Sequence, residues 1–439
     1  MLKRKVLLLF AVSAIMVCSI EAQTNSPYSR YGYGVLRDQY VGASKAMGGI
    51  GYGLRNSQSA NPLNPASYSR VDSLTFLFDM GVSFNKGKLS DGTNSDSHYS
   101  GGLDYITILV PLKKGLGMSF GVIPFSSVGY KFGSTETASG GTTVTYTKSF
   151  TGSGGLSQVY GGLGYSTPLK GFSVGANASF LFGTMNHTRS LPSVGSSGTN
   201  SYTSTDYTEL SIKSAKFDIG VQYEFPVSKK DVFTVGAVYS PKINSKADYT
   251  NYHYELNVAG GIASGDTITQ NGISAGLPET YGAGFTWKRN ERLVVGADIT
   301  YQKWDGVKYS SLMGDELSDS ERFNNRWRYN VGAEYMIDPY DRSFFKKIKF
   351  RGGLNYSNSY LNVTEASTKK VEGYKEYGAT LGFGFPIRDN LVGRVSYINL
   401  NFEYKKIKPQ IKTMIAEEYF GVSLNVNINE FWFFRKKID

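Results

Sequence analysis

The chain has almost no cysteine and very little histidine. Cys18 is the only cysteine in 439 residues, and it lies in an N-terminal stretch that we expect to be removed. A mature chain without cysteine excludes disulfides, thiol nucleophiles and cysteine-ligated zinc. The three histidines, His98, His187 and His253, fall in polar, loop-like stretches away from carboxylate clusters. We therefore expect no metal site, no cofactor and no enzyme activity.

Outside its N-terminus the chain also lacks long apolar runs, proline-rich linkers and capped helical segments. The mean hydropathy of −0.27 argues against membrane-spanning helices, but not against a β-barrel, whose interior face is polar. A soluble chain of this length would need two or three domains, yet no boundary is visible. Lysine and arginine are scattered despite a formal net charge of +11, so a nucleic-acid partner is not expected.

The N-terminus has the three parts of a secretory signal peptide. Basic residues at 3–5 precede an apolar run over residues 6–20, and the small residue Ala22 follows. We predict a signal peptide over residues 1–22, whose removal lowers the net charge to +9. A lipoprotein signal ending at Cys18 is an alternative, although Val17 is a poor residue before such a cysteine. A membrane anchor would need a longer run.

The rest of the chain is dominated by an alternation of apolar and polar residues. Over residues 74–84 the even positions are apolar, and the odd positions, apart from Leu77, are polar or glycine. A period of two indicates a β-strand. The pattern recurs in segments of about 10 to 15 residues, long enough to cross a bilayer as tilted strands. Fourteen candidate strands begin near Leu74, Tyr99, Gly117, Leu156, Phe172, Tyr207, Val232, Pro278, Arg292, Arg326, Lys347, Gly373, Leu391 and Ala416.

The connections between these strands alternate between short and long. Short connections are expected at residues 112–115, 168–171, 226–231, 288–291, 338–345 and 386–390. Long ones are expected at residues 86–98, 133–155, 187–206, 248–277, 305–325, 362–372 and 406–415. Short periplasmic turns and long outer loops are typical of bacterial outer-membrane barrels. We predict an all-β fold, a 14-stranded antiparallel transmembrane β-barrel over residues 74–428, in the outer membrane of a Gram-negative bacterium.

Two segments fall outside the predicted barrel. Residues 42–69 are rich in glycine, asparagine and proline and carry little charge, so they suit neither an independent fold nor a solvated linker. A compact plug inside the barrel satisfies both limits, and we assign residues 23–73 to it. Residues 429–439, which include Trp432 and several basic residues, are predicted to be a periplasmic or interfacial tail.

Charged side chains on the predicted strands fall on the face opposite the apolar residues. Because a charge facing lipid near the bilayer centre costs a few kcal/mol, we expect these side chains to point into the lumen. The interpretation we favour is a luminal polar network that holds the plug; a site for a ligand headgroup is the alternative. The predicted network comprises Asp79, Asp218, Glu224, Asp298, Arg328, Glu334, Arg351 and Arg394.

Three motifs resemble those of the FadL-type family of long-chain fatty acid transporters. The first joins residues 46–49, with Gly48 and Gly49, to Asn64, Pro65 and Ala66, and is similar to the hatch motif of that family. The second has the order Leu277–Glu279, Asp298, Tyr301 and Trp304; the third is the segment Arg326–Gly332. The resemblance covers the whole mature chain and implies fourteen strands around a hatch.

The resemblance also implies passive uptake of hydrophobic compounds, which leave sideways through the wall at a kinked third strand. Here that strand contains Ile123, Pro124, Phe125 and Ser126. Proline lacks the N–H group that a strand ladder needs, so a bulge or gap is expected at this point. A bend without an opening is the alternative.

Two functions of different classes remain open. The first is a channel for passive uptake of fatty-acid-like small molecules, with outer-membrane lipid and a hydrophobic ligand as partners. The second is a structural barrel subunit of a multiprotein outer-membrane assembly or secretion complex that has lost transport. The polar outer segment 193–208 and the aromatic-basic tail favour the second, whereas the hatch and Pro124 favour the first.

Overall fold

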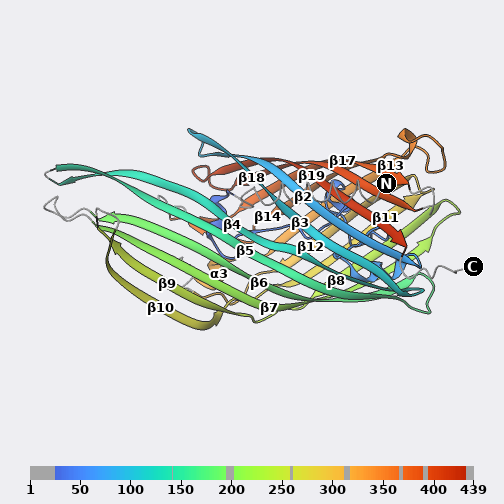
Figure 1. Cartoon of the computed structure of the whole chain (residues 1–439), viewed down its shortest axis with the longest axis horizontal. Helices are drawn as coiled ribbons and strands as arrows, with labels where there is room; N and C mark the ends of the chain where they lie inside the picture. Colours follow the sequence, from blue (N-terminus) through green and yellow to red (C-terminus); the bar gives the residue numbers. More distant parts are fainter. Residues whose placement is uncertain are drawn as a thin grey trace, which may run out of the picture.

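The fold is a closed β-barrel. The computed structural model describes residues 25–140, 142–193, 202–257, 261–310, 317–364, 369–388 and 394–431; the predicted signal peptide and residues 432–439 lie outside them. Fourteen strands follow one another around the wall, and the last pairs antiparallel with the first (Figure 1). They are β2 (Thr75–Ser90), β3 (Ser95–Lys113), β4 (Leu116–Gly140), β5 (Thr142–Ser166), β6 (Phe172–Ser193), β7 (Tyr202–Pro226), β8 (Asp231–Ser240), β11 (Glu279–Arg289), β12 (Leu293–Lys303), β13 (Arg326–Met336), β14 (Lys349–Asn358), β17 (Tyr374–Arg388), β18 (Val395–Pro409) and β19 (Ala416–Phe431).

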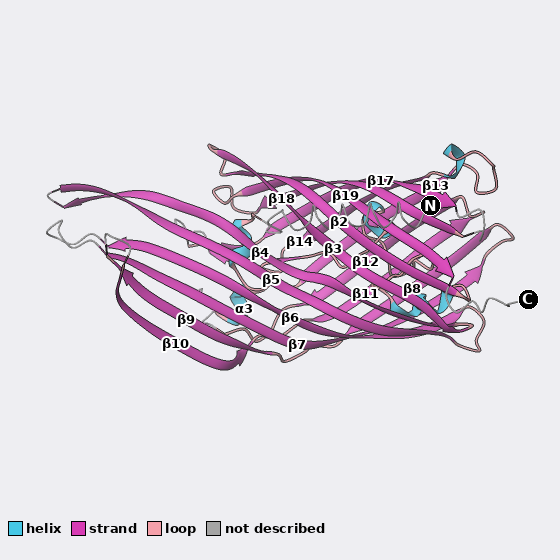
Figure 2. Ribbon diagram, in the orientation of Figure 1, coloured by secondary structure: helices cyan, strands magenta, loops and turns pink. Residues whose placement is uncertain are grey.

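The remaining elements are short or lie outside the ring of strands (Figure 2). They are β1 (Val35–Leu36), the hairpin of β9 (Lys246–Leu256) and β10 (Ile262–Ser274), the pair β15 (Val363–Thr364) and β16 (Val371–Glu372), and the short helices η1 (Pro27–Arg30), α2 (Ala43–Ala46), η2 (Pro65–Arg70), α3 (Asp319–Arg322) and η4 (Phe345–Lys347). Within the described ranges, no helix is both long enough and apolar enough to cross a membrane.

The alternation of side chains defines the two faces of the wall. In β13, Trp327, Tyr329 and Val331 point outward and are 41–53% exposed, whereas Arg326 and Asn330 are buried inside. An apolar outer face and a polar inner face are the pattern of a barrel in lipid. The predicted fold, with its fourteen strands and outer-membrane location, is confirmed.

Four of the predicted long loops are largely strand. β2 and β3 extend into residues 86–98, β4 and β5 into residues 133–155, and β6 and β7 into residues 187–206, whereas β9 and β10 occupy most of residues 248–277. The predicted start of the fourth strand at Leu156 is therefore too late, because β5 begins at Thr142. These segments are rich in serine, threonine, glycine and tyrosine and form sheet outside the membrane. They need no apolar face, so the alternation that marks a membrane strand is missing.

The wall is much taller on one side than on the other. β4, β5 and β7 have 25 residues each, about 80 Å at 3.3 Å per residue. On the opposite side β8 and β11 to β14 have 10 or 11 residues, close to the minimum for crossing a bilayer. The tall side therefore projects from the membrane as a sheet, which extends to the left in Figure 1.

The N-terminal residues run through the interior of the barrel. We call residues 26–41 the strap and residues 42–70 the plug. The strap lies in the outer half of the lumen, where Tyr33 joins a core of barrel and loop residues that includes Trp304 and Tyr360. The plug lies at the end that carries the short turns, and Tyr68 packs there with Leu77 and Tyr105. The chain then enters β2 at that end.

Candidate functional site

The plug contacts the barrel wall at inward-facing glycines. At Gly353 a Cβ atom would lie 2.1 Å from the backbone nitrogen of Gly48, and at Gly332 it would lie 2.1 Å from the carbonyl oxygen of Met47. Such distances are impossible for real side chains, so glycine is required for this approach. Plug atoms also lie within 3.0 Å of the position that a Cβ atom would take at Gly117, Gly164, Gly175, Gly220, Gly236, Gly282, Gly296 and Gly382.

Hydrogen bonds fix the plug to several strands. Asp298 on β12 accepts backbone N–H groups of Gly51 and Tyr52 at 2.5 and 3.0 Å. Thr380 on β17 accepts the N–H of Gly48 at 2.9 Å. Asn64 donates to the carbonyl of Val221 on β7 and accepts the N–H of Ala66, which caps η2. The predicted hatch motif residues 48, 49 and 64–66 therefore lie where the plug meets the wall.

The strand ladder of the wall is broken between β3 and β4. The pairing of these strands ends at Ile106 and Val122. β4 continues to pair with β5 on its other side, with a register shift between Pro124 and Ser126. The predicted break at residues 123–126 thus lies at the point where β3 and β4 separate.

The strap occupies the edge of β4 that β3 leaves. Val35 and Leu36 form β1 and pair antiparallel with Ser127 and Ser126. The N–H of Arg37 donates to the carbonyl of Phe125 at 2.9 Å, and further hydrogen bonds continue to both sides of this point. They join Gln39 Nε2 to the carbonyl of Pro124, Ser26 N to the carbonyl of Gly129, and Gly129 N to Ser29 Oγ.

Tyr33 anchors the strap in the outer half of the lumen. Its side chain is fully buried, and its hydroxyl donates to the carbonyl of Gly276 at 2.6 Å. The ring lies 5.2 Å from that of Tyr309 and 5.9 Å from that of Trp304. Tyr360 and Tyr309 in turn donate to strap carbonyls at 2.6 Å. The strap is therefore bound to the outer core and to the edge of β4 at once.

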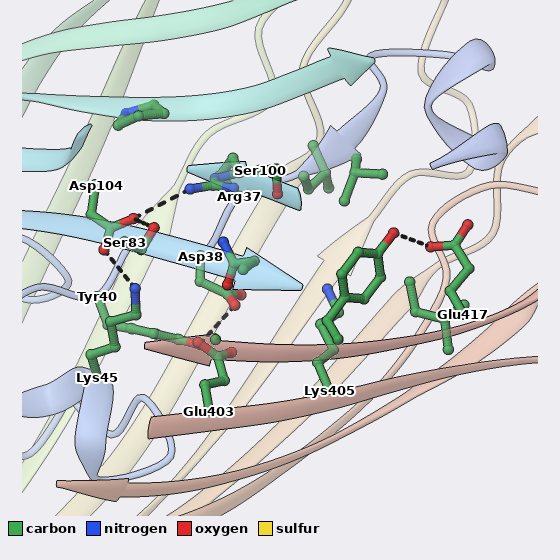
Figure 3. A pocket seen from close by; sticks show the side chains of 17 residues that line it. Arg37, Asp38, Tyr40, Lys45, Ser83, Ser100, Asp104, Glu403, Lys405 and Glu417 are labelled. Atoms are coloured by element: carbon green, nitrogen blue, oxygen red, sulfur yellow. Dashed lines mark hydrogen bonds and ion pairs between the residues drawn. The ribbon is translucent and has the colours of Figure 1, made fainter. Parts of the chain in front are cut away.

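Charged residues surround a cavity of about 110 Å³ beside the break. In Figure 3, Arg37 and Lys45 point at Asp104 of β3, at 3.4 and 2.6 Å, and Ser83 donates to the same carboxylate. Glu403, Lys405 and Glu417 line the opposite side. On the Asp104 side of this cavity, ion pairs join the strap and the plug to the wall.

Asp38 of the strap forms an ion pair with Arg328 of β13 and accepts a hydrogen bond from the hydroxyl of Tyr40 at 2.7 Å. Burial alone would raise the pKa of Asp38, but Arg328 and the neighbouring cations outweigh burial and hold the pKa below its ordinary value. Asp38 therefore stays ionised in the lumen, and the pair joins the strap to the wall opposite β4.

A second cavity of about 140 Å³ lies on the other side of the strap. Apolar residues such as Phe125 and Leu63 line one part of it, whereas Lys216, Asp218 and Arg328 line the rest. Arg37, Asp38 and Tyr40 border both cavities. The strap thus separates these two small cavities.

The eight residues of the predicted polar network do not form one network. Asp298 and Arg328 contact the plug and strap, and Asp79 reaches the plug through Tyr105, whose hydroxyl accepts the N–H of Gly42. The other five contact the wall or the periplasmic end. Glu334 forms an ion pair with Arg351, and Asp218 forms one with Lys216. Glu224 lines a cavity at the periplasmic end of the barrel. Arg394 donates hydrogen bonds to Thr75 and Asn429, where β2 and β19 pair.

Residues 26–41 fall within the plug predicted from the sequence, and a separate strap along β4 was not predicted. Tyr33, Arg37 and Asp38 lie in a short polar and aromatic stretch before the glycine-rich plug, and no period marks them. The repeated tyrosine and glycine of residues 31–34 is the one local signal, because it is unusual in a solvated N-terminus. No group of His, Cys, Asp or Glu within the described ranges could hold a metal ion.

Solved structures with the same fold are outer-membrane proteins. The chain is similar to a FadL homologue of Pseudomonas aeruginosa, at 12% identity and a TM-score of 0.60, over 90% of this chain and 99% of that one. It is similar to the toluene transporter TodX of P. putida, at 17% identity and a TM-score of 0.61, over 91% and 100%. It is also similar to the Ralstonia pickettii toluene transporter TbuX, at 16% identity and a TM-score of 0.57, over 89% of this chain and 98% of that one.

These likenesses and the closed wall define the class of protein: an outer-membrane β-barrel with the FadL-type fold. No curated protein matches the chain in sequence. The family described as BamG matches all of residues 1–439, and the chain belongs to that family.

Proposed function

We propose that the protein is a structural barrel subunit of a multiprotein outer-membrane assembly and that its lumen does not conduct. The observation that carries the proposal is the strap on β4. A break in a barrel wall leaves backbone groups that must find partners in the membrane, and here the strap supplies them from Pro124 to Gly129. The break is filled by the chain itself.

The chemistry of the lumen supports the same conclusion. The two cavities beside the strap have volumes of about 110 and 140 Å³, and Arg37 and Asp38 border both of them; apolar residues such as Phe125 line part of the larger one, next to the charged Arg328. A cavity of about 150 Å³ binds benzene when its lining is entirely apolar. Placing an apolar molecule against ion-paired groups would strip water from those groups without replacing its hydrogen bonds. The lumen suits a rigid support better than a pathway for hydrophobic compounds.

The height of one side of the wall supports a role in binding other proteins. β4, β5, β6 and β7 carry sheet far beyond what crossing a membrane requires. Transport through a lumen does not need this projection. A sheet that stands outside the membrane offers a large surface to other outer-membrane proteins.

A disulfide that locks the strap to β4 tests the proposal. Leu36 and Ser126 are direct partners in an antiparallel pair, within the Cα separation that a disulfide bridges. We expect the double variant Leu36→Cys/Ser126→Cys, once oxidised, to purify from native membranes with the same partner subunits as the wild type. The two single variants are the controls. Loss of the partners only in the oxidised double variant, or absence of stoichiometric partners from the wild type, would contradict the proposal.

A second candidate function is passive uptake of small hydrophobic, fatty-acid-like molecules. The break at Pro124 and the similarity in fold to transporters of toluene favour it. The ligand would leave between β3 and β4 after the strap had moved. The locked variant separates the two functions, because locking would abolish uptake of a labelled fatty acid or of toluene while reduction would restore it. Equal uptake by cells with and without the protein would exclude this second function.

A further inference from the structure

The hairpin of β9 and β10 has a sheet edge outside the membrane that no described strand covers at residues 262–273. It is inserted between β8 and β11, and β9 pairs with the upper part of β7 from Thr203 to Lys213. β10 pairs in turn with β9, from Ile262 to Ser274. The hairpin therefore widens the tall side of the wall by two strands, at the lower left of Figure 1.

The outer edge of β10 has the properties of a strand that accepts a partner. Apart from the half-buried Ile273, its 13 residues are exposed, including Ile262 at 66% and Ile268 at 51%. No register with a second strand is found for residues 262–273 in the described chain. Proteins protect long edges with lysine or proline, yet β10 contains neither, and Asp266 is its single charge.

A second copy of the chain does not fit this edge. Two copies in one membrane share an orientation, so a two-fold axis between them must run along the membrane normal. Their β10 strands would then run parallel, and identical residues would face each other at equal heights. In a parallel ladder, however, a residue whose N–H and C=O groups point at the partner strand lies opposite a residue whose groups point away. Two identical edges at equal heights cannot meet this condition. The matching partner is a segment of a different protein.

The charged residues of the hairpin indicate which side chains that partner carries. Among the described residues 246–257 and 261–274, Asp248, Glu255 and Asp266 are acidic and Lys246 is basic. An extended segment that carries lysine or arginine would complement this surface, and like charges would be repelled. The uncharged, β-branched run at residues 267–269 suits addition of a strand.

We propose that the free edge of β10 binds an extended, basic segment of a second protein at the cell surface and gains one strand from it. This inference rests on the proposed structural role and names the surface by which that role is performed. Backbone hydrogen bonds supply the ladder, and the acidic residues of the hairpin select the segment.

Hydrogen exchange provides a test with an internal control. Successive residues of a strand point their N–H groups to opposite edges, so alternate amides of β10 face β9 and the others face the free edge. The protein would be measured in native outer-membrane vesicles and again as the barrel alone, purified and refolded in detergent free of other subunits. We expect the amides that face β9 to be protected in both samples. Those at the free edge should exchange at least tenfold more slowly in vesicles than after purification. Equal exchange in the two samples would overturn the proposal.

Two substitutions complete the test. Thr267→Pro and Ile268→Pro remove N–H groups from opposite edges, so one of them breaks the hairpin and the other alters only the free edge. The free-edge variant should lose the protection seen in vesicles while the hairpin stays folded. Asp266→Lys should weaken that protection by charge, with Val227→Lys, at an exposed position in a periplasmic turn, as the matched control. If partner subunits copurify but none of these changes alters exchange, the surface is wrong and the structural role stands.

Discussion

Two sheet edges are left open by the strands of this barrel, and they are treated in opposite ways. The edge of β4 beyond Val122 faces the membrane and the lumen, and the strap covers it with β1 and with hydrogen bonds from four further residues. The edge of β10 lies outside the membrane, and no described strand pairs with it at residues 262–273. In lipid an unpaired backbone group costs several kcal/mol, whereas in water the solvent satisfies it. An open edge is therefore tolerated only outside the membrane, where it remains available to a partner.

The largest expected effect comes from releasing the strap. Tyr33→Ala removes a fully buried ring and its hydrogen bond to Gly276, which should cost about 3–5 kcal/mol of the free energy of unfolding. Urea unfolding in lipid vesicles would measure the loss. Tyr340→Ala, at a position 81% exposed, is the control and should change little. Equal stability of the two variants would mean that the outer core does not hold the strap over β4.

The next effect tests whether the covered edge depends on the plug below it. In Gly353→Ala the new Cβ atom would lie 2.1 Å from Gly48 N, whereas in Gly352→Ala the nearest atom is 3.8 Å away. We expect the first variant to lose about 1–3 kcal/mol by overpacking and to show ion conductance in planar bilayers. The neighbouring variant should resemble the wild type. Conductance in both or in neither would contradict a plug seated on that glycine.

A smaller effect is expected from the ion pair that joins the strap to the opposite wall. Asp38→Asn leaves Arg328 without its carboxylate and should cost about 2 kcal/mol. Because the pKa of Asp38 is lowered in the folded state, its contribution is complete above the unfolded value of about 3.9 and is lost only as pH falls through the lower folded value. The difference in stability between wild type and variant should therefore be constant from pH 7 to pH 5 and shrink in stronger acid. A difference that disappears already at pH 5.5 would contradict this assignment.

The smallest effect is expected where the hairpin that carries the free edge of β10 joins β7. His253 of β9 contacts Asp206 of β7 at 2.8 Å, and that hydrogen bond raises the pKa of His253 above its ordinary value. Because this pKa is raised in the folded state, protonated His253 stabilises the folded hairpin fully below about pH 6.5. This stabilisation is lost as the pH rises through the folded pKa. We expect the amides of β9 to exchange faster, relative to their intrinsic rates, at pH 8 than at pH 6. His253→Gln should remove the pH dependence, and its persistence in that variant would assign it elsewhere.

The parts of the fold that could be predicted are those in which one residue's surroundings follow from its neighbours in the chain. Alternation in segments such as residues 74–84 requires strands in lipid, and the connections inferred from it give the number of strands correctly. Pro124 marks the place where β3 and β4 separate, because a missing N–H group is a local property. Polar strands such as β10 were missed, since in water neither face has to be apolar.

The sequence by itself determined the class of the fold, the inward placement of charge and the weak point in the wall, because these follow from side-chain period and backbone chemistry. Only the tertiary structure decided what fills the weak point. The partners of the strap and plug are hundreds of residues away: Asp38 meets Arg328, Tyr33 meets Gly276, and Gly48 meets Gly353. No local pattern encodes such pairs, since each depends on how the closed wall brings distant strands around one segment.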